Sequence, residues 1–274
     1  MPHNKQKKIA VINDFCGFGR CSIAVSLPII SALKIQCCPL PTSIFSNHTG
    51  FESFYYYDFT RHMESYAKEW EKLNLSFSGI LTGFLGSPRQ IDIVAGFLER
   101  FAKEDTITVI DPVMGDNGSL YATYSPVLAK RMSQLVPYAH ILTPNLTEAC
   151  ILSGTPYKPD MGSDKLLNIC RKLSKMGPKE IVISGLDRGD ELENFVFEDG
   201  KTPVIVRQKR VGPCRSGTGD VFSSIIAADA VNGIPLVDSV RHASEFISKV
   251  LRRVVELDLP CTDGLCIEEF LKEV

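Results

Sequence analysis

The stretch Arg215–Asp220, RSGTGD, runs directly into the apolar segment Val221–Ala228. Its two glycines let the backbone turn tightly and approach a ligand closely. The apolar segment predicts a helix, whose first turn presents unpaired N–H groups and partial positive charge, a favourable place for a phosphate group. The Asp220 carboxylate is placed to take a proton from a hydroxyl that attacks this phosphate. The stretch therefore favours phosphoryl transfer onto an alcohol, although Gly-x-Gly-Asp is also typical of an ordinary turn and helix cap.

Upstream of this stretch, short β-branched segments alternate with longer amphipathic segments. We expect strands at residues 8–13, 36–43, 79–82, 106–110, 141–143 and 180–184, and helices at residues 21–34, 58–73, 89–103 and 164–175. A hairpin turned at Asp199-Gly200 is expected at one edge, and the last third of the chain is expected to be mostly helical. This alternation is typical of βαβ units around a largely parallel sheet, so the sequence predicts an α/β fold.

Composition narrows the class of protein. The 274 residues carry a net charge of −2, which gives no basic field for nucleic acid or an anionic membrane. The apolar run 9–12 is too short for a signal peptide or a membrane span. The nine cysteines form no Cys-x-x-Cys unit, so neither a disulfide framework nor a zinc site is expected. We expect a cytoplasmic protein that binds neither nucleic acid nor membranes.

Polar side chains gather where the expected strands end. These positions are Asn13-Asp14, Ser46–Gly50, Thr82–Phe84, Asp111–Asp116, Thr143–Asn145 and Ser184-Gly185. Each group alone is consistent with a turn, but the carboxyl ends of parallel strands meet at one rim, where ligands bind in such sheets. The sequence therefore predicts a binding site at this rim.

The chemistry of phosphoryl transfer assigns roles to several of these residues. Magnesium prefers oxygen ligands, which Asp111, Asp116 and Glu148 can supply with help from Asn145, unless these residues only form turns. Asp220 would accept the proton of the alcohol, and the amides of residues 217–219 would hold the developing negative charge.

Two other phosphate-binding motifs do not fit. The chain has no Gly-x-x-x-x-Gly-Lys-Ser/Thr loop. Residues 17–19, GFG, resemble half of a dinucleotide fingerprint, but Ser22 stands where the third glycine belongs.

Four motifs in order along the chain resemble those of the pyridoxal kinases, which belong to the ribokinase-like superfamily. They are Phe45–Gly50 (FSNHTG), Asp111–Asp116 (DPVMGD), Thr143–Glu148 (TPNLTE) and Gly217–Asp220 (GTGD). The resemblance runs from about residue 9 to the helix after Asp220. It implies a single ribokinase-like domain over residues 1–274, a three-layer αβα sandwich with a small edge hairpin and a flap, and a homodimer. It also implies ATP-dependent phosphorylation of the 5′-hydroxymethyl group of pyridoxal, pyridoxine or pyridoxamine, with Mg²⁺ and, in many members of the superfamily, K⁺.

The resemblance carries over to individual positions. It implies that Asp220 is the base and that Gly217, Thr218 and Gly219 form the anion hole. The residues implied to serve ATP are Asp111, Thr143, Asn145 and Ser184, those implied to serve the metal are Asp116 and Glu148, and those implied to serve the pyridine substrate are Asp14, Ser46, Thr49 and Phe84.

Two of these positions depart from the better-known pyridoxal kinases, which often carry Ser and Tyr where this chain has Asp14 and Phe84. One hypothesis is that Asp14 pairs with a pyridinium nitrogen or an amine and so favours pyridoxamine; the alternative is unchanged specificity. The aromatic segment Phe51–Phe59 is interpreted as either a flap over the substrate or a dimer contact. His48 is expected to be structural, and Arg207, Lys209 and Arg210 to form a solvated basic stretch rather than a phosphate site.

Two other functions remain open at this point. One is a kinase of hydroxymethylpyrimidine or its phosphate that uses the same base and anion hole. The other is a ligand-binding relative that no longer catalyses, against which the intact Asp220 and carboxylates argue.

Overall fold

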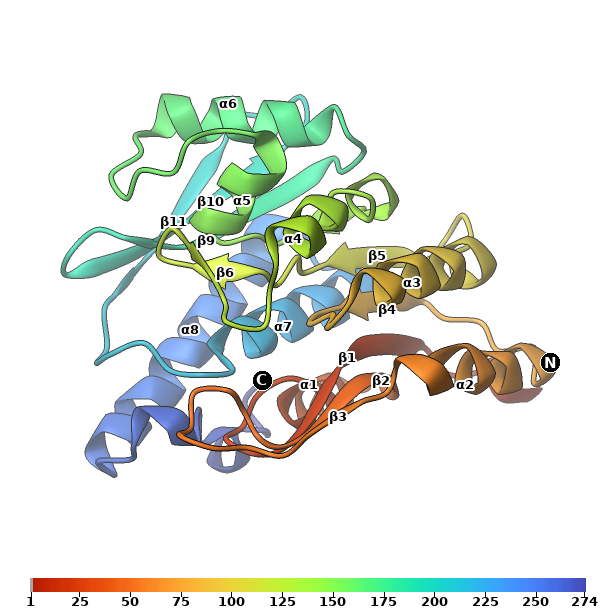
Figure 1. Cartoon of the computed structure of the whole chain (residues 1–274). Helices are drawn as coiled ribbons and strands as arrows, with labels where there is room; N and C mark the ends of the chain where they lie inside the picture. The colour runs from red at the N-terminus through yellow and green to blue at the C-terminus, as the bar shows by residue number, and fades with distance from the viewer. Residues whose placement is uncertain (1) are drawn as a thin grey trace.

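The computed structural model describes residues 2–274, and its central feature is a nine-stranded sheet in the order β11-β10-β9-β8-β5-β4-β1-β2-β3 (Figure 1). The strands are β1 (Lys8–Phe18), β2 (Gln36–Asn47), β3 (Tyr56–Asp58), β4 (Gly79–Thr82), β5 (Ile107–Ile110), β8 (Ile141–Leu142), β9 (Glu180–Asp187), β10 (Glu191–Glu198) and β11 (Val204–Lys209). All pairings from β2 through β1, β4, β5 and β8 to β9 are parallel, whereas β3, β10 and β11 pair antiparallel at the two edges. This mainly parallel sheet confirms the predicted α/β class.

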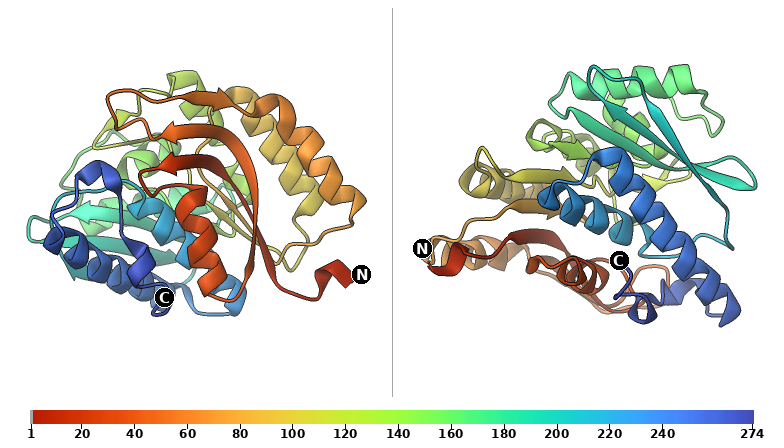
Figure 2. Two further views of the ribbon diagram at one scale, coloured as in Figure 1. Left: turned by 90° about the horizontal axis from the view of Figure 1, so that it is seen from below. Right: turned by 180° about the vertical axis from the view of Figure 1, so that it is seen from behind.

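Helices cover both faces of the sheet, which completes the predicted three layers (Figures 1 and 2). One face carries α1 (Ile23–Ala32), α7 (Thr218–Asn232) and α8 (Leu236–Glu256). The other carries α2 (Thr60–Lys72), α3 (Pro88–Phe101), α4 (Pro126–Met132), α5 (Leu146–Ser153) and α6 (Ser163–Ser174). The fold brings β1 close to the first turn of α7, as the hydrogen bond between Asn13 and Asp220 shows, although 207 residues separate these two residues in the chain.

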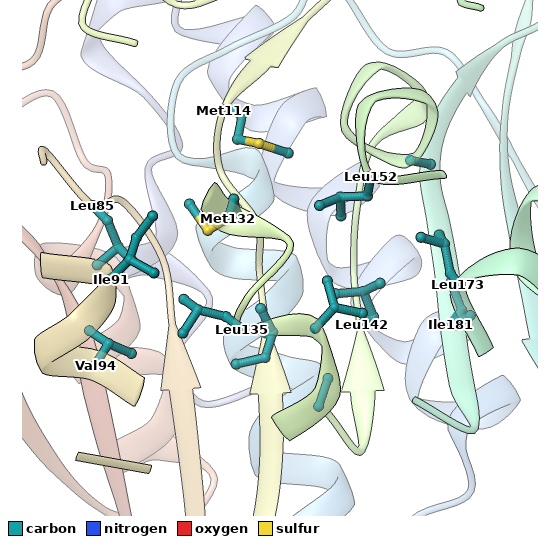
Figure 3. Packing of buried hydrophobic residues seen from close by; sticks show 14 of the residues in the cluster. Leu85, Ile91, Val94, Met114, Met132, Leu135, Leu142, Leu152, Leu173 and Ile181 are labelled. Carbon is teal, nitrogen blue, oxygen red and sulfur yellow. The ribbon is translucent and has the colours of Figure 1, made fainter. Parts of the chain in front are cut away.

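Alternate side chains of the strands supply two separate cores. On β1, Ala10 and Ile12 face α2 to α6, whereas Ile9 and Val11 face α1, α7 and α8. Figure 3 shows the first core, where side chains of α3, α4, α5 and α6 meet Leu142 of β8 and Ile181 of β9. Because both faces of the central strands are buried, these strands are apolar throughout rather than alternating, as parallel sheets require.

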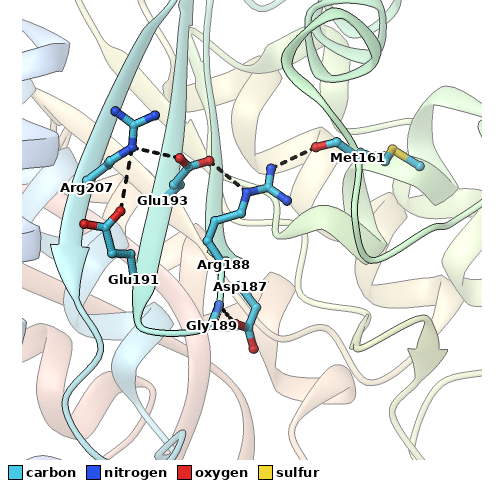
Figure 4. Close-up of polar contacts among 7 residues, drawn as sticks. All are labelled: Met161, Asp187, Arg188, Gly189, Glu191, Glu193 and Arg207. Atoms are coloured by element: carbon cyan, nitrogen blue, oxygen red, sulfur yellow. Dashed lines mark hydrogen bonds and ion pairs between the residues drawn. The ribbon is translucent and has the colours of Figure 1, made fainter.

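The antiparallel edge is stabilised by ion pairs at the tip of β9, β10 and β11 (Figure 4). Glu193 accepts from Arg188 and from Arg207, both at 2.9 Å, and Arg188 also donates to the main-chain oxygen of Met161 at 2.8 Å. Arg210 pairs with Asp187. Arg207 and Arg210 therefore form ion pairs with carboxylates of β10 and β9, in keeping with a solvated basic stretch rather than a phosphate site.

Several elements differ from the sequence-based expectations. β1 and β2 continue past residues 13 and 43 to Phe18 and Asn47, because they keep pairing with each other beyond a register shift at Asn13/Phe15. Pro28 lies inside α1, which begins at Ile23. The helix α4 and the small hairpin of β6 (Gly115–Asp116) and β7 (Ser119–Leu120) were not predicted, because their sequences show only turn-forming residues and a short apolar run.

All nine cysteines lie among the described residues and are free thiols, and six of them are buried, as expected for small apolar side chains. Within residues 2–274, none of the helices combines the length and the apolar character needed to span a bilayer.

Candidate active site

The helix α7 begins at Thr218, so that Asp220 lies in its first turn and the apolar segment 221–228 follows within the helix. Gly217 is the N-cap residue with φ +80°, and a Cβ at this position would overlap the carbonyl oxygen of Arg20. The Thr218 hydroxyl donates to the carbonyl oxygen of Arg215 at 2.9 Å and thereby holds the turn. The first N–H groups of a helix have no partner within it, so this turn presents amide donors beside the Asp220 carboxylate.

Asp220 contacts β1 at Asn13, where the pairing of β1 with β2 shifts register. Asn13 Nδ2 donates to Asp220 Oδ1 at 3.0 Å. Burial raises the pKa of Asp220, while main-chain Ser22 and the Asn13 amide oppose this shift by hydrogen bonding to the carboxylate. The carboxylate is thus a better proton acceptor than an exposed one and remains linked to two fixed donors.

Asp14, predicted to bind substrate, also lies beside Asp220 and is buried. Ser22 donates its hydroxyl to Asp14 Oδ1 at 2.6 Å. Burial raises the pKa of Asp14 to about 7, the Ser22 hydroxyl lowers it, and the charge of Asp220 raises it further. Ser22 adopts φ +57°, which a residue with a side chain rarely takes, and its contacts with both carboxylates explain why this strain is tolerated.

An Asp14→Asn variant is expected to be more stable than the wild type above pH 7. The Asp14 carboxyl keeps its proton up to about pH 7 when folded, but loses it near pH 4 when unfolded. The wild type therefore loses stability as the pH rises between these values, whereas the neutral amide does not. We expect a gain of about 2–4 kcal/mol in the free energy of unfolding at pH 8. Urea unfolding from pH 5 to pH 8 measures it, and a gain that does not shrink toward low pH would contradict the assignment.

A second group of carboxyls follows β5 and begins α5. Asp111 and Glu148 are buried. Burial raises the pKa of Asp111 well above its ordinary value, and the charges of Glu148 and Asp220 add to this, against a hydrogen bond from Ser223. Glu148 accepts from the main-chain N–H groups of Met114 and Asn145, both at 2.9 Å. Glu148 therefore anchors the 111–116 loop to α5, a role that the sequence analysis did not foresee.

Asn145 and Asp116 belong to the two segments that Glu148 connects, the start of α5 and the 111–116 loop. Asn145 forms a capping box with Glu148 and donates its amide to the carbonyl oxygen of Gly115 at 2.7 Å. Asp116 is only partly buried and accepts from the main-chain N–H of Asn117 at 2.7 Å. The Asn145 side chain is thus occupied by protein contacts, whereas Asp116 stays accessible.

The buried carboxyls fit a cation. None of Asp14, Asp111, Glu148 and Asp220 forms a salt bridge within residues 2–274, and burial together with neighbouring negative charge raises the pKa of Asp111. A cation relieves such repulsion, and oxygen donors are those that Mg²⁺ prefers. Within residues 2–274, no three His, Cys, Asp or Glu side chains are arranged to hold a metal ion by themselves. These oxygen donors therefore fit a Mg²⁺ ion that keeps several of its waters.

Three residues predicted to bind nucleotide lie close to the end of β8. Two of them, Asn145 after β8 and Ser184 on β9, are direct neighbours. The Thr143 hydroxyl is buried and has no hydrogen-bond partner among the described residues. Asn145 and Ser184 form a parallel bridge, and Ser184 N donates to the carbonyl oxygen of Pro144 at 3.0 Å. Thr143 therefore follows directly after β8, and Ser184 lies within β9 beside the residues that follow β8.

The residues predicted to bind the pyridine ring are only partly brought together. Phe84 N donates to Asn13 Oδ1 at 2.8 Å, and the Phe84 ring lies 6.0 Å from that of Phe45. Ser46, in contrast, uses its hydroxyl to accept from Tyr55 N at 2.8 Å and to donate to Asn47 Oδ1 at 2.6 Å. Thr49 is exposed in the turn after β2. Among the described residues, neither Ser46 nor Thr49 is hydrogen-bonded to Asp220 or Asp14.

The aromatic segment after β2 packs against Phe45 of that strand. Residues of β3 pair with β2, and the Phe45 ring contacts those of Phe54 at 5.8 Å and Tyr56 at 4.9 Å. His48 Nε2 lies 2.7 Å from the carbonyl oxygen of Thr262, in keeping with the structural role expected for it. Asn13, which the sequence analysis left without a role, proves to be a central residue of the site.

Comparison with known proteins agrees with this geometry. The family model described as phosphomethylpyrimidine kinase matches residues 32–261. A "putative phosphomethylpyrimidine kinase" from Bacteroides thetaiotaomicron superposes with a TM-score of 0.95 at 37% identity over 98% of this chain and 93% of that chain. An orthorhombic crystal form of it, with pyridoxal, gives a TM-score of 0.94 at 36% identity over 97% of this chain and 95% of that chain.

Curated relatives fall into two groups. The pyridoxal kinase PdxY of Leifsonia xyli is 26% identical over 91% of this chain and 90% of its own length. A hydroxymethylpyrimidine/phosphomethylpyrimidine kinase of Haemophilus influenzae is 29% identical over 62% of this chain and 63% of its own length. The resemblance to vitamin kinases that the motifs indicated is confirmed, and the chain belongs to the phosphomethylpyrimidine kinase family.

Proposed function

We propose that the protein is an ATP-dependent kinase that phosphorylates the 5′-hydroxymethyl group of a vitamin B6 vitamer. The observation that carries the proposal is the Asp220 carboxylate in the first turn of α7, beside the free amides of residues 217–219. Family membership supports phosphoryl transfer. The pyridoxal in crystals of the Bacteroides relative, which is 36% identical, supports a B6 vitamer as the acceptor.

In this proposal the vitamer's 5′-oxygen attacks the γ-phosphorus of ATP while Asp220 accepts the hydroxyl proton. A new O–P bond forms, the bond from the γ-phosphorus to the β–γ bridging oxygen breaks, and ADP leaves with that oxygen. The amides of residues 217–219 hold the negative charge on the transferring group, which is the main task in phosphoryl transfer. Phe84 and the neighbouring Phe45 offer a stacking surface for the pyridine ring.

The proposed reaction also uses a magnesium ion, which carboxylates at the rim would hold. Asp111 and Asp116 would hold it directly or through water, and Glu148 would fix the loop that carries them. When bound, Mg²⁺ neutralises charge on the phosphates. Thr143, Asn145 and Ser184 are proposed to line the nucleotide side of the same rim, with Ser46 and Thr49 on the substrate side. Assistance by K⁺, as in many members of the superfamily, and a cytoplasmic location also belong to this proposal.

A homodimer is the final part of the proposal. The exposed aromatic residues of the segment after β2, Phe54, Tyr55 and Tyr57, support an interface there. Light scattering on the purified protein would test it.

Turnover on four alcohols tests the proposed function. ADP release is measured by a coupled assay with pyridoxal, pyridoxine, pyridoxamine and hydroxymethylpyrimidine, each with and without Mg²⁺. The proposal predicts Mg²⁺-dependent turnover with a higher kcat/KM for at least one vitamer than for the pyrimidine. A preference for the pyrimidine would assign the chain to the function of its Haemophilus relative, and binding of a vitamer without turnover would assign it to a non-catalytic relative.

An Asp14→Ser variant is expected to lose any preference for pyridoxamine. Asp14 is buried beside Asp220, and an amine or pyridinium nitrogen of the substrate would offer it the cationic partner that it lacks within residues 2–274. We expect the ratio of kcat/KM for pyridoxamine over pyridoxine to fall by about 10-fold, as for loss of one charged hydrogen bond. An unchanged ratio would show that Asp14 does not select the vitamer.

A further inference from the structure

The side chain of Asn13 joins three separate elements of the site. Its Oδ1 accepts from Asp14 N at 2.9 Å and from Phe84 N at 2.8 Å, and its Nδ2 donates to Asp220 Oδ1 at 3.0 Å. Only the oxygen of a carboxamide accepts hydrogen bonds. The two main-chain donors therefore set the orientation of the amide and direct its NH₂ group toward Asp220.

The packing around Asn13 prevents this amide from turning away. Asn13 is 4% exposed. Gly83 covers the amide so closely that a Cβ there would overlap its Cγ, Oδ1 and Nδ2. Gly83 itself is held by its N–H, which donates to the carbonyl oxygen of Ile12 at 2.8 Å. The Asn13 amide is thus held in place by Gly83, which follows β4 and is itself hydrogen-bonded to β1.

The position of Asn13 follows from the alternation along β1. Ile9 and Val11 face the layer that contains α7, and Asn13 is the next residue in that series. The apolar alternation ends in an amide at the point where the first turn of α7 brings Asp220.

We propose that Asn13 is the positioning residue for Asp220, holding Oδ1 of the carboxylate so that Oδ2 faces the attacking hydroxyl. The proposal rests on the proposed function, in which Asp220 is the base. An amide donor neither gives up nor accepts a proton here, so Asn13 acts only by orientation. Misplacing a catalytic group by about 1 Å costs about 100-fold in rate, which makes orientation a large effect.

Two variants remove this orientation by different routes. Asn13→Ala deletes the amide, and Gly83→Ala leaves it in the sequence but displaces it. Both are expected to lower kcat for the preferred alcohol by about 10- to 100-fold, with KM for ATP within about twofold of the wild type. A lower kcat at unchanged KM separates lost orientation from lost binding.

Thr106→Ala is the matched control. Thr106 is 1% exposed and makes two hydrogen bonds, to the carbonyl oxygen of Phe77 and from Lys103 N, at the opposite, amino end of β5. This variant also loses a buried polar side chain, which controls for a general loss of stability. Because Thr106 lies at the opposite end of the sheet from Asp220, kcat is expected to stay within about twofold of the wild type. If Asn13→Ala does not fold, Gly83→Ala and Asn13→Ser provide the same comparison.

The outcomes separate this inference from the proposed function. A kcat within twofold of the wild type in folded Asn13→Ala, or a rise in KM alone, would overturn the positioning role. If the wild type phosphorylates only the pyrimidine, the B6 assignment fails and the variants are compared on that alcohol. A crystal structure of Asn13→Ala decides the matter without any substrate: the inference requires Asp220 to leave its wild-type orientation, and an unmoved carboxylate would refute it.

Discussion

Replacing Asp220 by asparagine is expected to lower kcat for the preferred vitamer by about 10²- to 10⁴-fold, the usual contribution of a general base. The amide has the shape of the carboxylate and still accepts from Asn13, but it cannot take the hydroxyl proton. The change removes a buried charge, so the variant is not expected to be less stable than the wild type. Steady-state kinetics and calorimetric titration with pyridoxal measure the two effects, and binding is expected to persist.

Asp229→Asn is the matched control for this experiment. Asp229 is 4% exposed, lies on the same helix α7 and pairs with His242 at 2.8 Å, away from the first turn. Its variant is expected to keep kcat within about twofold while losing some stability, because it weakens a partly buried pair. An Asp220→Asn enzyme as fast as the wild type would remove Asp220 from the role of base.

Gly217→Ala is expected to reduce kcat/KM by about 10²- to 10³-fold, comparable to the loss of one charge-stabilising donor. Gly217 has φ +80°, and a Cβ would overlap the carbonyl oxygen of Arg20, so the turn must shift to admit a methyl group. A shifted turn no longer aims the amides of residues 217–219 at the phosphate. The measurement is kcat/KM with saturating ATP, together with the melting temperature.

Gly233→Ala separates the effect of this clash from backbone strain. Gly233 ends the same helix with φ +84°, yet a Cβ there would meet nothing within 4 Å. Both variants force alanine into a left-handed conformation, which costs roughly 1–2 kcal/mol. Only the Gly217 change is expected to affect turnover, and equal losses in both variants would mean that strain in α7, rather than the anion-binding turn, limits the reaction.

Local sequence patterns predicted the largely parallel α/β sheet and placed several polar residues at one rim, whereas the three layers were implied by the resemblance to pyridoxal kinases. Strand β4 was expected at residues 79–82 and is found there, because four buried residues stand between clear breaks. The first turn of α7 was predicted because its glycines and Asp220 precede a buried apolar helix. The carboxylates after β5 and in α5 could be assigned to the rim because parallel strands end at one edge of a sheet.

What the sequence could not show depends on contacts between distant residues. Asn13 and Asp220 are 207 residues apart, and their hydrogen bond depends on β1 lying beside α7. Ser22 seemed only to break a dinucleotide motif, but its strained backbone and hydroxyl serve the Asp14–Asp220 pair. The buried Glu148 was expected to bind metal, whereas its carboxylate also accepts two main-chain N–H groups that no sequence pattern reveals.

The most direct test of the account is a crystal structure of the enzyme with pyridoxal and a non-hydrolysable ATP analogue. If Asp220 is the base, the 5′-oxygen lies within hydrogen-bonding distance of Asp220 Oδ2 and the γ-phosphate rests on the amides of residues 217–219. A pyridine ring bound elsewhere, or a γ-phosphate remote from the first turn of α7, would contradict it.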